Sequence, residues 1–404
     1  MSASLLYHTQ QIYGFQFSGW NYSSGTVYAD IIQKRDKQCC TACLSYDITP
    51  SFVKIREIKA LPMGCKQLVL RVHVHRLRCH RCGAFRQEKL PFLHSPKARI
   101  SKALARSILE MRSEMSIKAV AAYFDLHWET VKNVEKQNLK QKFRSIRLRD
   151  VKIIGIDEIH TGRKKGFLTI VRDLESGAVL HVGKGKGEKG LKGFGRRLKQ
   201  SRCRIEAAAV DMAPGYTLWL KNNLKETVIV YDHFHVIKLM NQKIDSLRRT
   251  TMADADESMK DMLKNSRWLW LKSPEKLKEN QKERLEVLRN VFDELSTAVF
   301  MRDCLRKIYR MAIDDTDAEL CFEFWCQLAE GSGISCLKTM AKTIRSKMEG
   351  ILAYWNQNGL TSAGMEGFNN KIRWLIRQAY GFRDQEYFKL KIFDLPNIKT
   401  EKEL

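Results

Sequence analysis

Three short, mainly apolar segments of this chain each lead to an aspartate. They are residues 151–156 before Asp157, residues 207–210 before Asp211, and residues 227–230 before Asp232. Apolar runs of this length are typical of buried strands in a sheet that is covered on both faces. A carboxylate that follows such a strand lies at the edge of the sheet, where open α/β sheets bind their ligands. Acids on two parallel neighbours therefore predict a functional site at this edge.

A hairpin is expected between the first two of these segments. Residues 166–171 and 178–182 have strand patterns, and the turn Glu175-Ser-Gly177 joins them. A strand that carries an acid and continues into a hairpin is how RNase H-like sheets begin. We therefore expect a mixed sheet in which 151–156, 207–210 and 227–230 lie beside this hairpin.

A third acid, Glu366, begins a segment in which apolar residues recur at helical spacing. The apolar stripe is Phe368, Ile372, Leu375, Ile376 and Ala379, and the opposite side holds Glu366, Asn370, Arg373 and Arg377. A helix that packs this stripe on the sheet would present one carboxylate and two cations along a single edge. The alternative is an ordinary amphipathic helix whose polar face is only solvated.

Two C-x-x-C pairs near the N-terminus predict a structural zinc site. The pairs are Cys40 with Cys43 and Cys79 with Cys82, and 35 residues separate them. Two such turns complete a tetrahedral site, and the strand patterns at 52–58 and 67–75 would join them as a small antiparallel sheet. Three histidines and another cysteine are competing ligands, namely His73, His75, His80 and Cys39, which could replace Cys40. Buried cysteines without a metal are the remaining alternative.

The segment 116–134 has the spacing of a helix-turn-helix. A preceding helix is expected to begin at Pro96 and to run through residue 111. Asp125 occupies the turn, and aspartate tolerates the left-handed conformation better than most residues. The second helix would enter a major groove with Glu129, Thr130, Lys132 and Asn133 pointing outward. A simple helical hairpin is the alternative.

The charge of the chain supports a nucleic-acid partner. Lysine and arginine number 71 against 45 acidic residues, which gives a formal net charge of +26. An excess of this size is typical of proteins that neutralise phosphates. The sequence has neither a run of 18 apolar residues nor a secretory signal pattern, so we expect no membrane attachment and a reduced cytoplasmic setting.

Residues 237–360 are expected to be almost wholly helical. Apolar residues recur at three-and-four spacing over 239–247, 277–297 and 334–352. Tryptophans are concentrated in this region, at Trp268, Trp270, Trp325 and Trp355. Most tryptophans belong to a core, and the less common role would be stacking on a base flipped out of DNA.

Four strings give the chain a specific family resemblance. They are IDE at 156–158, VDM at 210–212, DHFHV at 232–236, and MEGFNNKIRWLIRQAYGFRDQEYFKLKI at 365–392. Together with the cysteine pairs and the helix-turn-helix, they resemble bacterial insertion-sequence transposases of the ISL3 family over nearly the whole chain. Mild departures are Asp125 at the turn and the residues 361–364, where that family commonly has an Asn-Gly lead-in.

This resemblance implies a chemistry and a set of partners. Asp157, Asp211 and Glu366 would be the catalytic triad, holding two Mg²⁺ or Mn²⁺ ions for phosphodiester cleavage and strand transfer. Asp232 and His235 would support the site without binding metal, and Lys371, Arg373 and Arg377 could contact DNA phosphates. The expected partners are double-stranded DNA, as element terminal repeats and as target, and further copies of the chain in at least a dimer. The expected location is the bacterial cytoplasm, on the nucleoid when DNA is bound.

We therefore predict a multidomain α+β and α/β chain with four parts. They are a zinc ribbon-like module (1–95), a helix-turn-helix domain (96–150), an RNase H-like mixed-sheet core (151–236 and 361–404) and an all-helical insertion (237–360). Three other functions fit part of the pattern. One is a catalytically inactive DNA-binding regulator descended from a transposase, another is a repair or recombination nuclease, and the third is a zinc-ribbon transcription factor.

Overall fold

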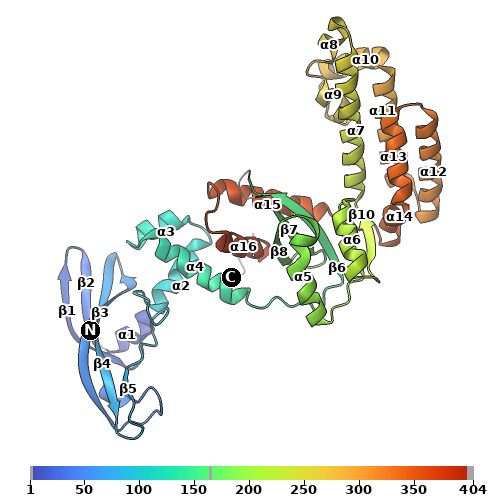
Figure 1. Cartoon of the computed structure of the whole chain (residues 1–404). Helices are drawn as coiled ribbons and strands as arrows, with labels where there is room; N and C mark the ends of the chain where they lie inside the picture. Colours follow the sequence, from blue (N-terminus) through green and yellow to red (C-terminus); the bar gives the residue numbers. More distant parts are fainter. Residues whose placement is uncertain (1–2, 163–165, 398–404) are drawn as a thin grey trace. The chain divides into compact units, whose positions relative to one another are not determined.

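The computed structural model of the chain describes residues 3–162 and 166–397 (Figure 1). It divides into two compact units, residues 1–144 (unit 1) and 145–404 (unit 2). The finer division into four parts stays a prediction, and the last residues of the predicted RNase H-like core, 398–404, lie outside the described residues.

Unit 1 begins with a sheet in which β4 pairs with three other strands. Its elements are α1 (Ala3–Gln10), β1 (Phe15–Ser23), β2 (Thr26–Gln33), β3 (Ile48–Met63), β4 (Lys66–Cys79) and β5 (Phe85–Gln87). The strands β3 and β4 form a long antiparallel hairpin, and β2 lies parallel to β4 on its other side. The expected hairpin is confirmed but is longer than predicted, while α1, β1 and β2 were not predicted.

Three helices follow the sheet in unit 1. They are α2 (Lys102–Arg112), α3 (Ile117–Tyr123) and α4 (Trp128–Lys142). The prediction that Pro96 begins the first helix was wrong, because the Ser101 side chain accepts a hydrogen bond from the Leu104 amide and caps the helix there. The turn between α3 and α4 is as predicted, with Asp125 in the left-handed region at φ 48°.

Unit 2 is built on a sheet of five strands in the order β10-β9-β6-β7-β8. The strands are β6 (Ile153–His160), β7 (Phe167–Asp173), β8 (Val179–Lys184), β9 (Ala207–Val210) and β10 (Val228–Tyr231). Consecutive strands β6, β7 and β8 are antiparallel, whereas β9 and β10 run parallel to β6. The five expected strands are thus all present, in a mixed sheet.

Helices cover both faces of this sheet. Alternate residues of its strands point to opposite faces, and both faces carry apolar side chains that a helix must cover. The helices are α5 (Gly187–Ser201) and α6 (Pro214–Asn223) on one face, and α15 (Ala363–Gln378) and α16 (Gln385–Asp394) on the other. Along β6, Ile154 and Ile156 belong to the core that contains α5 and α6. Ile159 belongs to the core that contains α15 and α16. The period of two along the strand therefore decides which helix each side chain meets.

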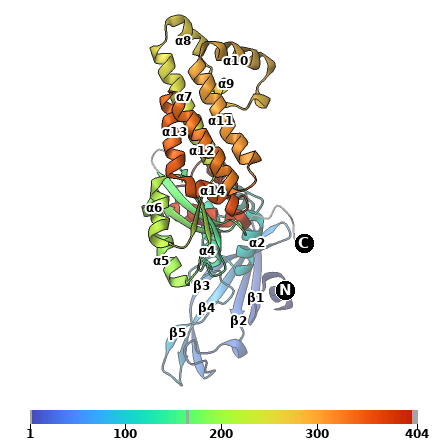
Figure 2. The ribbon, with the colours of Figure 1, turned by 90° about the vertical axis from the view of Figure 1, so that its right-hand side faces the viewer.

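The region between β10 and α15 is helical, as predicted. Its helices are α7 (His233–Asp254), α8 (Glu257–Leu263), α9 (Arg267–Leu271), α10 (Glu279–Val291), α11 (Asp293–Met311), α12 (Asp315–Gly331), α13 (Ser335–Ser346) and α14 (Met348–Asn356). Figure 2 shows α7, α11, α12 and α13 running side by side. The expected helices at 277–297 and 334–352 are each broken, at Phe292 and at Lys347. Trp270 and Trp325 are buried as expected, but Trp268 is 57% exposed.

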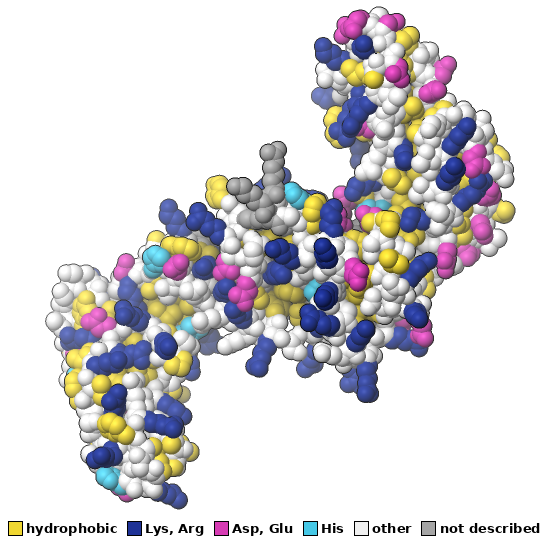
Figure 3. All heavy atoms as spheres, viewed as in Figure 1, with side chains coloured by type: hydrophobic (Ala, Val, Ile, Leu, Met, Phe, Trp, Pro, Cys, Tyr) yellow, Lys and Arg dark blue, Asp and Glu magenta, His cyan; other side chains and the backbone are white. Residues whose placement is uncertain are grey.

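Lysine and arginine side chains spread over the surfaces of both units, as Figure 3 shows. Across the described residues, no helix combines the length and the apolar character that a membrane crossing requires.

The close packing of α5 on the sheet gives a first prediction, for Gly190→Ala. A Cβ at Gly190 would lie 2.1 Å from Oγ1 and 2.6 Å from Cβ of Thr169 on β7. We expect the free energy of unfolding to fall by about 1–3 kcal/mol, because overpacking forces α5 away from the strand. Urea denaturation of the full chain measures it. The control is Gly331→Ala in α12, where a Cβ meets nothing within 4 Å and no loss is expected. Equal stability of the two variants would contradict the prediction.

Candidate active site and DNA-binding modules

The register of the parallel strands aligns three aspartates. Ile156 of β6 pairs with Val210 of β9, and Val210 pairs in turn with Tyr231 of β10. Asp157, Asp211 and Asp232 each follow one of these residues directly. The three carboxyl groups therefore leave neighbouring strands at the same level of the sheet.

One detail of the sequence prediction was wrong at this point. We expected the first strand to end before Asp157, but β6 continues to His160. Asp157 pairs with Ile170 of the antiparallel neighbour β7. The strand β7 extends past the end of β9, so its pairing keeps Asp157 within the sheet. Asp211 follows the last residue of β9 and therefore lies beyond the end of its strand.

Asp157 is held by hydrogen bonds at both of its carboxylate oxygens. The backbone amide of Glu158 donates to Oδ1 at 2.7 Å, and Nδ2 of Asn369 on α15 donates to Oδ2 at 2.6 Å. Burial raises the pKa of Asp157, and the nearby charge of Asp211 raises it further, whereas His235 acts in the opposite direction. This carboxylate therefore carries an electrostatic cost that a bound cation would relieve.

The sequence pattern did not predict a role for Asn369. It assigned the next residue, Asn370, to the polar side of α15 and left Asn369 without a function. Asn369 is buried together with Met365, Phe368, Ile372 and Leu375, so it belongs to the face that packs on the sheet. The close approach depends on Gly155 of β6, where a Cβ would lie 3.0 Å from Met365. No local pattern marks a buried asparagine whose partner lies 212 residues away.

Glu366 lies one helical turn before Asn369 on α15 and is exposed. Among the described residues, the carboxylates of Asp157, Asp211 and Glu366 do not converge to ligand-sharing distance. Helix α15 thus brings Glu366 to the neighbourhood of Asp157, but its side chain extends into solvent.

Asp232 has a different environment from Asp157. Its carboxylate is almost fully buried and accepts hydrogen bonds from the Phe234 amide (2.9 Å), the Ser362 amide (2.7 Å) and the Ser362 hydroxyl (2.5 Å). Burial alone would raise the pKa of Asp232, but the hydrogen bonds of His233, Ser362 and Phe234 outweigh it and lower the pKa well below its ordinary value. His235 Nε2 lies 3.5 Å from the Ser362 hydroxyl. This network joins the start of α7 to the start of α15.

Glu158 belongs to the opposite face of the sheet. Lys186 Nζ lies 2.8 Å from Oε1 of Glu158, and the Tyr216 hydroxyl donates to Oε2 at 3.3 Å. Because neighbouring residues of a strand face opposite sides, Asp157 is the acid of this pair that faces α15.

The structure brings the four predicted cysteines of unit 1 together. Cys40 and Cys82 have their sulfurs 3.6 Å apart, as do Cys43 and Cys79, and all four sulfurs lie within 4.8 Å of one another. Tetrahedral zinc with Zn–S bonds of about 2.3 Å separates its sulfurs by about 3.8 Å. The amides of Cys43 and Ala42 lower the pKa of Cys40 to about 6, which favours the thiolate that zinc binds. At Cys43 the Ser45 amide acts in the same direction, but the hydrogen bond with Cys82 and burial outweigh it and raise the pKa to about 12.

The competing ligands have other partners. His73 lies 3.1 Å from Asp30, His75 contacts Glu88, and His80 shares a 2.8 Å hydrogen bond with Thr49. Cys39 is not part of the cluster. The four-cysteine set is thus the one that the geometry favours, and the chemistry of its donors suits zinc.

The candidate DNA-contacting residues lie on two helices. On α4, Glu129 and Asn133 are exposed, Thr130 and Lys132 are half-buried, and Lys132 Nζ lies 5.4 Å from the ring centre of Trp128. On α15, the residues Lys371, Arg373 and Arg377 are exposed. Their roles in DNA binding stay predictions.

Two segments of the chain match known protein-family models. Residues 154–392 match the ISL3 DDE family described as "Transposase", and residues 88–137 match the "Helix-turn-helix domain of transposase family ISL3". The chain belongs to the ISL3 family of transposases. The resemblance found in the sequence is therefore confirmed, over more than half of the chain by the first match alone.

Individual relatives of this ISL3 transposase are bacterial. It is 31% identical over 391 residues to the transposase for insertion sequence element IS1001 of Bordetella parapertussis, which covers 95% of each chain. It is 24% identical over 293 residues to the transposase for insertion sequence element IS1557 of Mycobacterium tuberculosis, covering 66% of this chain and 65% of that one. A more distant solved structure is the Drosophila P element transposase strand transfer complex, with 10% identity and a TM-score of 0.41 over 74% of this chain and 92% of that one.

The cysteine cluster gives a second prediction, for Cys79→Ser. We expect the full chain to lose its bound zinc, about one ion per chain in the wild type, and to unfold at a lower temperature. The reason is that metal binding to four thiolates contributes directly to folding. Metal analysis by mass spectrometry and a thermal melt measure both effects. The matched control is Cys65→Ser, because Cys65 is an exposed cysteine outside the cluster. Full zinc content in Cys79→Ser would contradict the prediction.

The network of Asp232 gives a third prediction, for Asp232→Asn. The neutral amide loses the charge-assisted hydrogen bonds, so the free energy of unfolding at pH 7 should fall by about 2 kcal/mol. Because folding lowers this pKa below its ordinary value of 3.8, the stabilisation is complete above that value. It is lost as the pH falls from there toward the folded-state pKa. The difference between wild type and variant should thus stay constant from pH 8 to pH 5 and narrow below pH 4.

Urea denaturation across this pH series measures the difference. The matched control is Asp256→Asn, since Asp256 also caps a helix, α8, but is exposed. Its cost should be small and independent of pH, because asparagine caps helices as well as aspartate does. A difference for Asp232→Asn that does not narrow in acid would count against the proposed role of its charge.

Proposed function

We propose that this ISL3 transposase cleaves DNA at the ends of its insertion sequence and joins them to target DNA, with Asp157, Asp211 and Glu366 as the catalytic acids. The observation that carries the proposal is the alignment of Asp157 with Asp211 on parallel strands, with α15 docked against Asp157 through Asn369. The strand order, with three antiparallel strands followed by two parallel ones, supports an RNase H-like core.

The residues of the site suit hard divalent cations. Asp157 and Asp211 offer carboxylate oxygens, and the charge of Asp211 disfavours that of Asp157. Glu366 would supply a third carboxylate from α15. Two Mg²⁺ or Mn²⁺ ions held by these three acids would activate the attacking oxygen and stabilise the leaving oxygen of a phosphodiester displacement.

The other residues of the site act by orienting these acids. Asn369 and the Glu158 amide each hold one oxygen of Asp157, so the direction of its lone pairs is fixed. The hydrogen bonds between Asp232 and Ser362 fix the start of α15 and with it the position of Glu366. Asp232 and His235 therefore serve as positioning residues, in agreement with the support role predicted for them.

The remaining modules would deliver DNA to this site. We propose that α4 enters a major groove with Glu129, Thr130, Lys132 and Asn133, and that Lys371, Arg373 and Arg377 contact phosphates. Zinc at the four cysteines has a structural role. Because two element ends must be joined, the working complex contains at least two copies of the chain, and we place it on the nucleoid in the bacterial cytoplasm.

The proposal gives a fourth prediction, which uses Asp157→Ala, Asp211→Ala and Glu366→Ala. We expect each variant to bind DNA carrying the native element end while Mg²⁺-dependent cleavage falls about a thousandfold or more. Loss of a cation that contributes several kcal/mol to the transition state explains this size. Asn369→Ala, which removes an orienting group, should lower cleavage about 10–100-fold. Gel assays of cleavage and of binding measure both properties.

The matched control is Glu206→Ala. Glu206 is an exposed acid immediately before β9, at the opposite end of the strand from Asp211, and it pairs with Lys152. Its removal should leave cleavage unchanged. If the wild-type chain binds the element end tightly but cuts with neither Mg²⁺ nor Mn²⁺, the chain is instead a catalytically inactive DNA-binding regulator of this family.

A further inference from the structure

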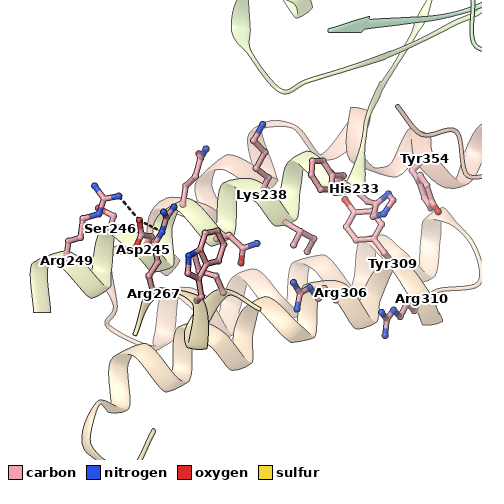
Figure 4. A pocket seen from close by; sticks show the side chains of 16 residues that line it. His233, Lys238, Asp245, Ser246, Arg249, Arg267, Arg306, Tyr309, Arg310 and Tyr354 are labelled. Carbon is pink, nitrogen blue, oxygen red and sulfur yellow. Dashed lines mark hydrogen bonds and ion pairs between the residues drawn. The ribbon is translucent and has the colours of Figure 1, made fainter. Parts of the chain in front are cut away.

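The helical region of unit 2 contains a cavity of about 800 Å³. Residues of α7, α9 and α11 line most of it, and Tyr354 of α14 lies at one end (Figure 4). Cavities of about 300–1,000 Å³ are of the size that encloses small organic ligands, whereas a nucleic-acid duplex is too wide to enter. The site described above does not use this cavity.

The charge of the lining is strongly positive. Five of its side chains are cationic, namely Lys238, Arg249, Arg267, Arg306 and Arg310, and one is acidic, Asp245. Asp245 is shared among three guanidinium groups, at 2.9 Å from Arg248, 2.6 Å from Arg249 and 3.3 Å from Arg267. One carboxylate cannot neutralise three guanidinium groups, so this end of the cavity keeps an excess of positive charge. A polyanion is the ligand that such a surface attracts.

Aromatic side chains give the cavity a second property. Trp268 is 57% exposed, although Trp270 on the same short helix is buried, and the Arg267 guanidinium lies 4.9 Å from the Trp268 ring centre. At the other end, labelled in Figure 4, the rings of His233, Tyr309 and Tyr354 lie within 5.7 Å of one another. Exposed rings beside cations are the combination that stacks on bases while the cations bind phosphates.

The hydroxyl of Tyr309 favours a ligand with polar groups. Its oxygen is buried yet has no hydrogen-bond partner among the described residues. A buried hydroxyl without a partner costs free energy, so a ligand group that hydrogen-bonds to it would stabilise the complex. Bases and phosphates both offer such groups.

The cavity is connected to the candidate active site through α7. This helix begins immediately after Asp232, and the residues His233, Phe234 and Lys238 line the cavity. Burial raises the pKa of Asp157, and the positive charge of Lys238 offsets a small part of that rise. Lys238 belongs to the lining of the cavity, and α7 connects that lining to the end of the sheet that carries the candidate acids.

We propose that this cavity binds unpaired nucleotides of a DNA strand that extends from the cleavage site, with Trp268 stacking on a base and Arg306 and Arg310 contacting phosphates. Because a duplex is too wide to enter the cavity, a base that stacks on a ring inside it has left the duplex, which is why the ligand is unpaired. This inference rests on the proposed function, since it places the bound strand next to the catalytic acids.

The experiment compares two fluorescent probes in binding to the full chain. One is a blunt duplex carrying the element end, and the other is the same duplex with a single-stranded thymidine extension. EDTA prevents cleavage, so the measurement does not depend on catalysis. We expect the extension to tighten binding of the wild type about tenfold, the effect of stacking one or two bases. Trp268→Ala and Arg310→Gln should lose this gain while binding the blunt duplex as before.

Two control variants match the altered residues in chemical type and in exposure. Phe324→Ala removes an aromatic ring that is 62% exposed on α12, and Lys307→Gln removes an exposed cation on α11, and neither residue lines the cavity. Both should keep the tenfold gain, and Trp268→Phe should keep most of it. If Trp268→Ala melts at a lower temperature than the wild type, exposed Arg310 decides the question.

The inference is overturned if the wild type gains no affinity from the extension, or if Trp268→Ala and Arg310→Gln keep the gain. It is also overturned if both variants lose affinity for the blunt duplex equally, since the cavity would then contact paired DNA. A different result would refute the proposed catalytic function. A chain that gains affinity from the extension but never cuts would refute catalysis and leave the cavity as a single-strand site.

Discussion

The buried carboxylate of Asp232 is the contact on which the arrangement of unit 2 depends. It caps α7 where the chain leaves the sheet, and it binds the amide and hydroxyl of Ser362 where the chain returns 130 residues later. Because Ser362 precedes α15, this contact determines where that helix begins. The position of Asn369 beside Asp157, and the place of Glu366 one turn earlier, follow from it.

Asp157 and Asp232 follow aligned residues of the same sheet, but their carboxylates have different environments. A buried carboxylate is costly unless hydrogen bonds compensate for its lost hydration. Asp232 has enough donors for its pKa to fall, so it is a stable anion that holds two helices. Asp157 has fewer, and it lies near Asp211, so its pKa rises. Hydrogen bonds thus stabilise the charge of Asp232, whereas the charge of Asp157 keeps a cost that the proposed cation would offset.

The sequence predicted features that depend on local pattern. The strand β9 was predicted at its observed bounds because an uninterrupted apolar run leaves little choice, and Asp125 was correctly placed in a left-handed turn. The extent of β6 beyond Asp157 depends on β7, which no local pattern reveals. Asn369 and Ser362 were missed because each acts on an aspartate more than a hundred residues away, and the mainly polar sequence around Asn369 suggested exposure.

The contact between Asp232 and Ser362 joins the two ends of the helical region, and this affects how its length can change. The entropy of closing a loop grows only with the logarithm of its length, so a segment pinned at both ends can change size at little thermodynamic cost. Helices between Asp232 and Ser362 can therefore be added, lost or exchanged while the sheet and α15 keep their geometry. The sheet and α15 are in this sense a fixed frame, and the helical region is the part of unit 2 whose length can change.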